Sequence, residues 1–271
     1  NCYSFEVSPF MHLLATVKLE RGYKLQDFIN HHITVGQFLK GKLQPIRKFM
    51  SPPLANTFQP RKGKKKWVFD VGVMNGILDI KYAISLVADE KYCKLFSIAL
   101  ASILLDVSNV YRNGKCLSYK EDWIDRKTKR REVHKKFLDK LSNLILPDIE
   151  KLQRIESTVE NFKYCIHGDV RKSISQIPNG SIDLVITSPP YLNSRDYTDI
   201  YLAELWILDL VKSYEELKQL RHKTFISHVQ VKHGVIEELN IPELKRVLKK
   251  LHEKKMEMWN EDLPTMIKGY F

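Results

Sequence analysis

The sequence predicts an α/β fold, in which short strands alternate with helices. Residues 2–6 have the pattern of a strand, and Ser8 follows as the N-cap of an amphipathic helix. Residues 161–170 indicate a second strand that ends at Asp169, and a connection with a short helical stretch leads to a third strand at 182–186. This alternation predicts a parallel sheet, in which ligands bind at the carboxyl ends of the strands.

The middle of the chain is predicted to be mainly helical. Residues 20–66 contain short helical patterns broken by glycines and prolines, which predicts a loop-rich stretch. The apolar spacing from 67 to 109 favours helices, and 130–158 has the pattern of a long charged helix. No internal repeat interrupts this order.

Charge and composition limit the classes of function. The 271 residues have a formal net charge of +12, concentrated in runs at 61–66, 125–136 and 244–255, which is typical of a protein that binds a polyanion. The alternative is that lysine-rich faces only solvate helices. The four cysteines are scattered without metal-ligand spacing, so we expect no metal site, buried free thiols and a reducing, cytoplasmic location. The longest apolar run, 95–107, is too short and too interrupted for a membrane span.

The most unusual segment is "SIDLVITSPPY", in which the third predicted strand runs into Ser188-Pro189-Pro190-Tyr191. Each proline fixes its own φ and keeps the residue before it out of the α region, so the turn is rigid and presents fixed acceptors. A second Ser-Pro-Pro at 51–53 has no strand before it and no aromatic residue after it, which predicts an ordinary loop.

The stretch "DLVITSPPY" resembles the catalytic motif of DNA methyltransferases that modify exocyclic amino groups, and the segments around it are similar to one branch of that family. The resemblance implies a Rossmann-like fold and S-adenosylmethionine as cofactor. It also implies double-stranded DNA with a flipped base as substrate, often within restriction–modification. Asp169 matches the acid that contacts the adenine of the cofactor, and Glu6 resembles the acid that binds its ribose hydroxyls. Thr187, just before the motif, would belong to the same cofactor site.

The chemistry explains the composition of the turn. An amino nitrogen of cytosine or adenine is a poor nucleophile because its lone pair is delocalised into the ring. Acceptors at the Ser188 side chain and the Pro189 carbonyl would favour the pyramidal nitrogen, and Tyr191 would stack on a base that has left the duplex. Serine in the first position is more typical of cytosine-N4 than of adenine-N6 methylation, and no cysteine follows a proline, as methylation at carbon 5 would need.

One expected feature of the family is not found in this sequence, a Phe-x-Gly-x-Gly loop between the first strand and the first helix. The stretch at 67–76 imitates it but has Met74 in place of the central glycine, which indicates a helix start instead. We therefore expect a fragment that is inactive alone, whose missing loop precedes Asn1 or is supplied by a second polypeptide. Its methyltransferase core would comprise 1–20 and 159–271, and 21–158 would be a mainly helical insertion for target recognition.

Two other functions remain open. The chain would act without catalysis if it is a nucleic-acid-binding remnant of such an enzyme. Alternatively it would methylate RNA or a protein amide, because Asn-Pro-Pro-Tyr loops serve amide nitrogens too, although serine and the basic charge count against an amide.

Overall fold

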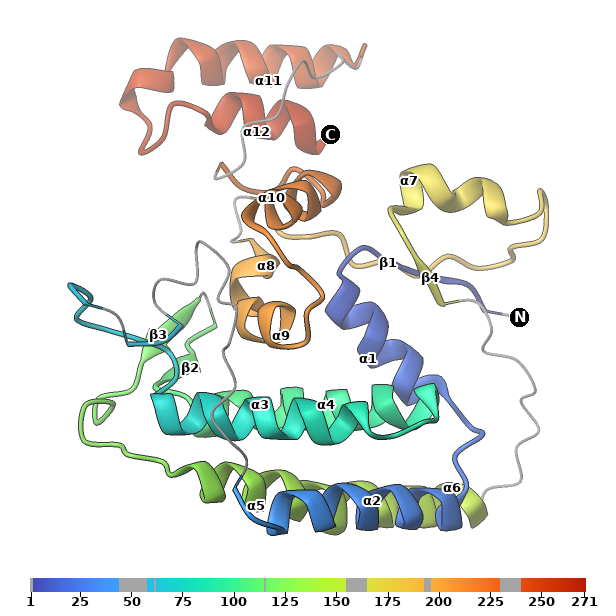
Figure 1. Ribbon diagram of the computed structural model, residues 1–271. Coiled ribbons are helices and arrows are strands. Elements are labelled where there is room, and N and C mark those ends of the chain that lie inside the picture. The colour runs from blue at the N-terminus through green and yellow to red at the C-terminus, as the bar shows by residue number, and fades with distance from the viewer. Residues whose placement is uncertain are drawn as a thin grey trace.

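The structure is a computed structural model of the protein. It describes residues 2–43, 58–60, 62–114, 116–154, 165–192, 196–229 and 240–271. Two small sheets and a larger set of helices give a mixed α/β architecture (Figure 1). The strands are β1 (Ser4–Glu6), β2 (Val110–Arg112), β3 (Leu117–Tyr119) and β4 (Cys165–His167).

The helices fall into three groups along the chain. The first half contains α1 (Pro9–Leu19), α2 (Leu25–Lys40), α3 (Val71–Ser85) and α4 (Glu90–Val107). The α5 helix (Arg130–Lys140) continues through a π-helical turn at Leu141–Ile145 into α6 (Leu146–Arg154). The last group comprises α7 (Val170–Ser173), α8 (Tyr197–Ile200), α9 (Leu202–Ile207), α10 (Tyr214–Lys223), α11 (Pro242–Glu253) and α12 (Leu263–Tyr270), with short 3₁₀ turns at Ile174–Gln176 and Lys255–Glu257.

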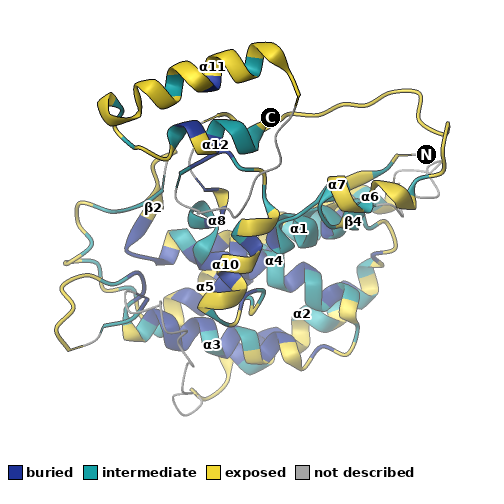
Figure 2. Cartoon of the chain, turned by 90° about the horizontal axis from the view of Figure 1, so that it is seen from above, coloured by how far each residue is buried: buried dark blue, intermediate teal, exposed yellow. Residues whose placement is uncertain are grey.

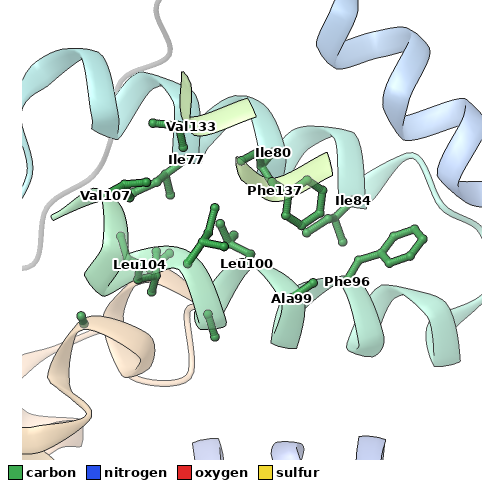
Figure 3. Packing of buried hydrophobic residues seen from close by; sticks show 14 of the residues in the cluster. Ile77, Ile80, Ile84, Phe96, Ala99, Leu100, Leu104, Val107, Val133 and Phe137 are labelled. Atoms are coloured by element: carbon green, nitrogen blue, oxygen red, sulfur yellow. The ribbon is translucent and has the colours of Figure 1, made fainter. Parts of the chain in front are cut away.

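Most of the buried hydrophobic residues lie between the helices of the middle of the chain. The α3 helix lies against α2, α4 and α5, while α1 and α9 pack on α4 (Figure 1). The interface shown in Figure 3 is built from isoleucines of α3, aromatic and aliphatic residues of α4, and Val133 and Phe137 of α5. Figure 2 shows the contrast between α3, which is largely buried, and α11, which is mostly exposed.

A buried polar cluster also joins α3 to α5. Both carboxylate oxygens of Asp79 accept a hydrogen bond from the Arg130 guanidinium, at 2.6 Å each, and the Nε2 atom of His134 lies 2.9 Å from Asp79 Oδ2. Burial lowers the pKa of His134 despite this carboxylate, so the imidazole is neutral near pH 7. The cluster thus supplies hydrogen-bond donors to both oxygens of the Asp79 carboxylate, whose residue is only 2% exposed.

The two sheets differ in pairing. The β1 and β4 strands form a parallel pair in which Glu6 is opposite His167, and β2 and β3 form an antiparallel pair. The predicted strands at 2–6 and 161–170 are confirmed over Ser4–Glu6 and Cys165–His167, while Val170 already begins α7. The Ser8 N-cap, the helix start near Val71 and the charged helix as far as Arg154 are also confirmed.

Three predictions were wrong. Residues 182–186 form no strand, and Leu184, Val185 and Ile186 are exposed: a run of β-formers becomes a strand only beside another strand, and no described residue pairs with it. The stretch predicted to be loop-rich contains the 16-residue helix α2, because burial of its apolar face outweighs the cost of Gly36. The cysteines are free, but Cys2 is exposed and the others are only half-buried.

Among the residues that the structure describes, no helix is long and apolar enough to cross a membrane.

Candidate functional site

The parallel pair of strands brings two acidic residues together from opposite ends of the sequence. The backbone N–H of Gly168 donates to the carbonyl of Glu6 at 3.0 Å, which extends the β1–β4 register to the point where both strands end. The imidazole of His12, on α1, contacts the Cys165 carbonyl at 3.0 Å and fixes the helix against β4. Glu6 and Asp169 therefore lie at the same, carboxyl edge of the strand pair.

A cavity of about 940 Å³ opens at this edge. Six of the seven residues that the sequence predicts as site residues line it: Glu6, Asp169, Thr187, Ser188, Pro189 and Pro190. The seventh, Tyr191, is not among the lining residues, and its side chain points into solvent with 80% of the residue exposed. The structure thus gathers the carboxylates and the Ser-Pro-Pro turn around one cavity, whose volume is within the range of small-molecule sites.

The two carboxylates differ in their partners. The Oε1 atom of Glu6 accepts the backbone N–H of Ser8 at 2.7 Å, while no described residue donates to its Oε2 atom. The Asp169 carboxylate accepts the backbone N–H of Arg171 at 3.0 Å, as the N-cap of α7, and is also paired with the Arg171 guanidinium at 2.7 Å. These hydrogen bonds, foremost those from the guanidinium, hold the pKa of Asp169 below its usual range.

The Ser-Pro-Pro turn is contacted by the C-terminal helix. The hydroxyl of Tyr270, on α12, donates to the Pro190 carbonyl at 2.7 Å, and both residues line the cavity. The bond leaves the Pro189 carbonyl and the Ser188 hydroxyl without a described protein partner. No local sequence pattern predicts the role of Tyr270, because only the tertiary fold brings residue 270 to residue 190.

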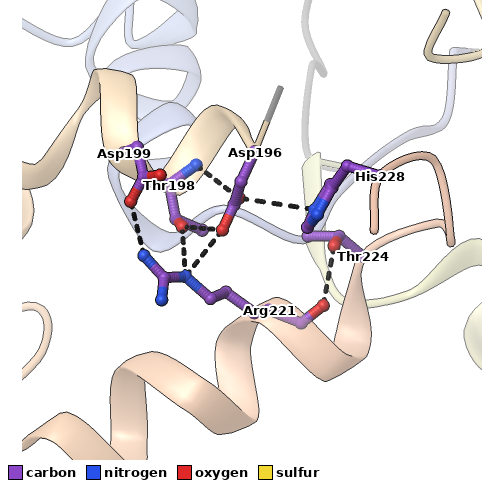
Figure 4. A network of polar contacts seen from close by, with 6 residues as sticks. All are labelled: Asp196, Thr198, Asp199, Arg221, Thr224 and His228. Atoms are coloured by element: carbon purple, nitrogen blue, oxygen red, sulfur yellow. Dashed lines mark hydrogen bonds and ion pairs between the residues drawn. The ribbon is translucent and has the colours of Figure 1, made fainter. Parts of the chain in front are cut away.

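A buried polar network forms another wall of the cavity (Figure 4). The Asp196 carboxylate, on a residue that is 2% exposed, accepts the Thr198 backbone N–H at 2.8 Å and the Thr198 hydroxyl at 2.6 Å. The Arg221 guanidinium lies 2.6 Å from the same carboxylate and 2.5 Å from Asp199. The network therefore ties the start of α8, which follows the Ser-Pro-Pro-Tyr turn, to α10.

His228 completes this wall. Its Nε2 atom lies 4.0 Å from Asp196, and its buried Nδ1 atom has no hydrogen-bond partner among the described residues. Burial lowers the pKa of His228, although Asp196 opposes the shift. This network was not predicted from the sequence. The one available signal was Asp196 itself, because aspartate is a preferred N-cap residue and Asp196 caps α8.

The described residues contain no group of histidine, cysteine and acidic side chains arranged to hold a metal ion. The cavity instead offers carboxylates, hydroxyls and carbonyls as acceptors beside apolar rings, a set that suits an organic ligand rich in hydrogen-bond donors.

Comparisons with known proteins agree with the motif. The chain is 27% identical over 217 residues to the Type II methyltransferase M.BsoBI of Geobacillus stearothermophilus, an alignment that covers 65% of the chain and 42% of that protein. It is 33% identical over 113 residues to the Type II methyltransferase M.AvaI of a Nostoc strain and to that of Anabaena variabilis, covering 37% of the chain and 23% of each relative.

The chain spans less than half the length of these curated relatives. No family model matches the sequence, and no solved structure matches the fold. The partial similarity to M.BsoBI and M.AvaI agrees with the resemblance of the Ser-Pro-Pro-Tyr segment to DNA methyltransferases, and the relatives that the chain matches are Type II methyltransferases.

Proposed function

We propose that this chain forms the catalytic part of an enzyme that transfers a methyl group from S-adenosylmethionine to an exocyclic amino group in DNA, with cytosine N4 favoured over adenine N6. The observation that supports it most is the single cavity shared by Glu6, Asp169 and the Ser188-Pro189-Pro190 turn. On this proposal β1 and β4 are neighbouring strands of a Rossmann-like sheet, with the ligand at their carboxyl edge.

The cofactor fits the carboxylate end of the cavity. The Oε2 atom of Glu6 has no described donor and is suited to accept ribose hydroxyls, while the Asp169 carboxylate is suited to accept the adenine amino group. Thr187 also lines the cavity and directly precedes the Ser-Pro-Pro turn along the chain. S-adenosylmethionine supplies an electrophilic methyl group on its sulfonium when bound.

The turn supplies the acceptors for the base. The Ser188 hydroxyl and the Pro189 carbonyl would accept the two hydrogens of the target amino group, which favours a pyramidal nitrogen with its lone pair free to attack. Tyr191 is exposed in this structure, so we propose that it stacks on the base only after the base has left the duplex. The hydrogen bond from Tyr270 fixes the far side of the turn and helps to preorganise it.

We propose that the basic runs contact the phosphates of DNA. Lysines of 62–66, Lys135 and Lys136 on α5, and Lys249 and Lys250 on α11 are all exposed, and no ion pair neutralises them among the described residues. We propose that residues 21–158 are a helical insertion that contributes to target recognition. The same surfaces favour the second candidate function, a nucleic-acid-binding protein without catalysis.

A second polypeptide with a Phe-x-Gly-x-Gly loop is the partner that would complete the methionine end of the site. Among the described residues that line the cavity, the one glycine is Gly168. The proposed core therefore comprises 1–20 and 159–271 together with that loop.

Methyl transfer tests the proposal directly. Duplex DNA is incubated with labelled S-adenosylmethionine and the chain, alone and with a polypeptide that carries the glycine-rich loop, and the nucleosides are separated. The proposal predicts label in N4-methylcytosine. Label in N6-methyladenine would overturn the preference for cytosine, and tight DNA binding without label in either arm would favour the second candidate.

A further inference from the structure

Arg171 makes a set of contacts that the proposed function has not used. Its Nε atom lies 2.9 Å from Asp169 Oδ1 and 3.1 Å from Oδ2, and its NH2 atom lies 2.7 Å from Oδ2. Together with its backbone N–H, which donates to Oδ1, Arg171 thus donates hydrogen bonds to both oxygens of the Asp169 carboxylate. A guanidinium matches a carboxylate in this fork geometry, which a lysine cannot reproduce.

The other side of the Arg171 guanidinium contacts the segment that begins at the end of α10. The NH2 atom donates to the Lys223 carbonyl at 3.3 Å, and the guanidinium carbon lies 4.8 Å from the centre of the Phe225 ring. Asp169, Lys223 and Phe225 all line the cavity. Arg171 therefore links the end of β4 to a second wall of the cavity through contacts of different kinds, and this fixes the orientation of its side chain.

The contacts leave room for one more donor on Asp169. Each carboxylate oxygen offers two lone-pair directions. Oδ1 uses them for the backbone N–H and the Nε–H of Arg171. Oδ2 accepts the short NH2 bond and only the longer, shared contact from Nε. The second acceptor direction of Oδ2 is thus occupied only by this longer, shared contact, which a donor from a ligand in the cavity would replace.

Other charged or titratable groups surround this corner. They are Glu6 on β1, His12 on α1, His167 on β4, Lys172 on α7 and Lys223 on α10. Lys172 adds a weaker, purely electrostatic contribution to the low pKa of Asp169, whereas Arg171 acts mainly through hydrogen bonds.

We propose that Arg171 is a positioning residue, which holds the Asp169 carboxylate charged and directed so that Oδ2 accepts the amino group of a purine nucleoside. This inference rests on the proposed cofactor site. It assigns to Arg171 a role separate from that of the basic runs, since its guanidinium, although 44% of the side chain is exposed, is paired with Asp169 and packed on Phe225.

The first test measures the pKa of the Asp169 carboxyl group. The side-chain carboxyl of Asp169 is titrated by carbon NMR in the full chain, with Asp169→Asn to assign the signal. Arg171→Gln should move the titration to higher pH, because the hydrogen bonds that stabilise the charged form are lost. Arg171→Lys should restore only part of the shift. Lys172→Gln is the matched control, since it removes an adjacent charge without removing a hydrogen bond to Asp169.

The second test measures ligand binding by calorimetry with S-adenosylhomocysteine over a range of pH. Arg171→Gln should weaken the binding of S-adenosylhomocysteine about tenfold at pH 7. As the pH is lowered, the affinity of the variant should begin to fall at a higher pH than the affinity of the unmodified chain. An unchanged Asp169 titration, or an equal shift in Lys172→Gln, would overturn the role of Arg171. Tighter binding by Arg171→Gln would show that the arginine blocks the site. If the unmodified chain binds no S-adenosylhomocysteine while the titration shifts as expected, the proposed cofactor site fails, and with it the ligand role of Arg171.

Discussion

The network around Asp196 gives the sharpest prediction for stability. Every group in hydrogen-bond contact with this carboxylate is a donor: the Thr198 N–H, the Thr198 hydroxyl and the Arg221 guanidinium. In Asp196→Asn the new NH2 group has to face one of these donors. The guanidinium of Arg221 also loses the negative charge of Asp196, which is its buried partner. Removing one member of a buried pair costs about 3–5 kcal/mol. Arg221 keeps Asp199, and its side chain is 21% exposed, so we expect the lower end, about 3 kcal/mol.

Urea unfolding followed by circular dichroism measures this loss. With a slope of about 3 kcal/mol per molar urea, the midpoint should move down by about 1 M. The matched control is Asp209→Asn, which neutralises a carboxylate that pairs with Lys81 at 2.7 Å but is 59% exposed. That surface pair should cost at most about 1 kcal/mol. If the two variants lose equal stability, or Asp196→Asn loses less than the control, the network does not hold this wall together.

Three further predictions concern other parts of the molecule. Gly76→Ala should destabilise the protein by about 1–3 kcal/mol in urea unfolding, because the new Cβ would lie 2.8 Å from the Val133 Cβ, whereas Gly36→Ala, with its nearest atom at 3.9 Å, should be neutral or stabilising. The free energy of unfolding should fall as the pH drops below about 6.5, because burial lowers the folded-state pKa of His134 and His228, so that the unfolded chain binds more protons than the folded one. A thermal midpoint that stays constant between pH 7 and 5 would contradict this. Reversing the charge of Lys135 and Lys136 should lower the salt dependence of duplex binding by about 0.9 in the log–log slope per lost phosphate contact, whereas reversal of Lys151 on α6 should not.

Local signals in the sequence were sufficient for several elements. The Ser8 side chain accepts the Met11 N–H, and Pro9 begins α1, as the residue preferences of helix starts predict. The placement of Glu6 and Asp169 on one edge followed from the rule that parallel strands end on the same side. These features depend on neighbouring residues or on the direction of a strand, both of which are visible in a single sequence.

The features that the sequence analysis missed depend on contacts between distant segments. Residues 182–186 have strand composition, but a strand also needs a pairing partner, and composition does not supply one. The contact of Tyr270 with the Pro190 carbonyl joins residues 80 apart in sequence. The pairing of Arg221 with Asp196, and the position of His228 beside them, likewise required the fold.

The central proposal is that the Ser188-Pro189-Pro190 turn is catalytic and that the Ser-Pro-Pro sequence at 51–53, which lies outside the described residues, is not. Initial rates of labelled methyl transfer to duplex DNA, in the presence of the polypeptide that carries the glycine-rich loop, should be compared for Ser188→Ala and Ser51→Ala. Loss of one preorganised hydrogen-bonding group from such a site costs about 100-fold or more in rate. We expect a loss of this size for Ser188→Ala with unchanged binding of S-adenosylhomocysteine, and a normal rate for Ser51→Ala. A normal rate for Ser188→Ala would contradict it.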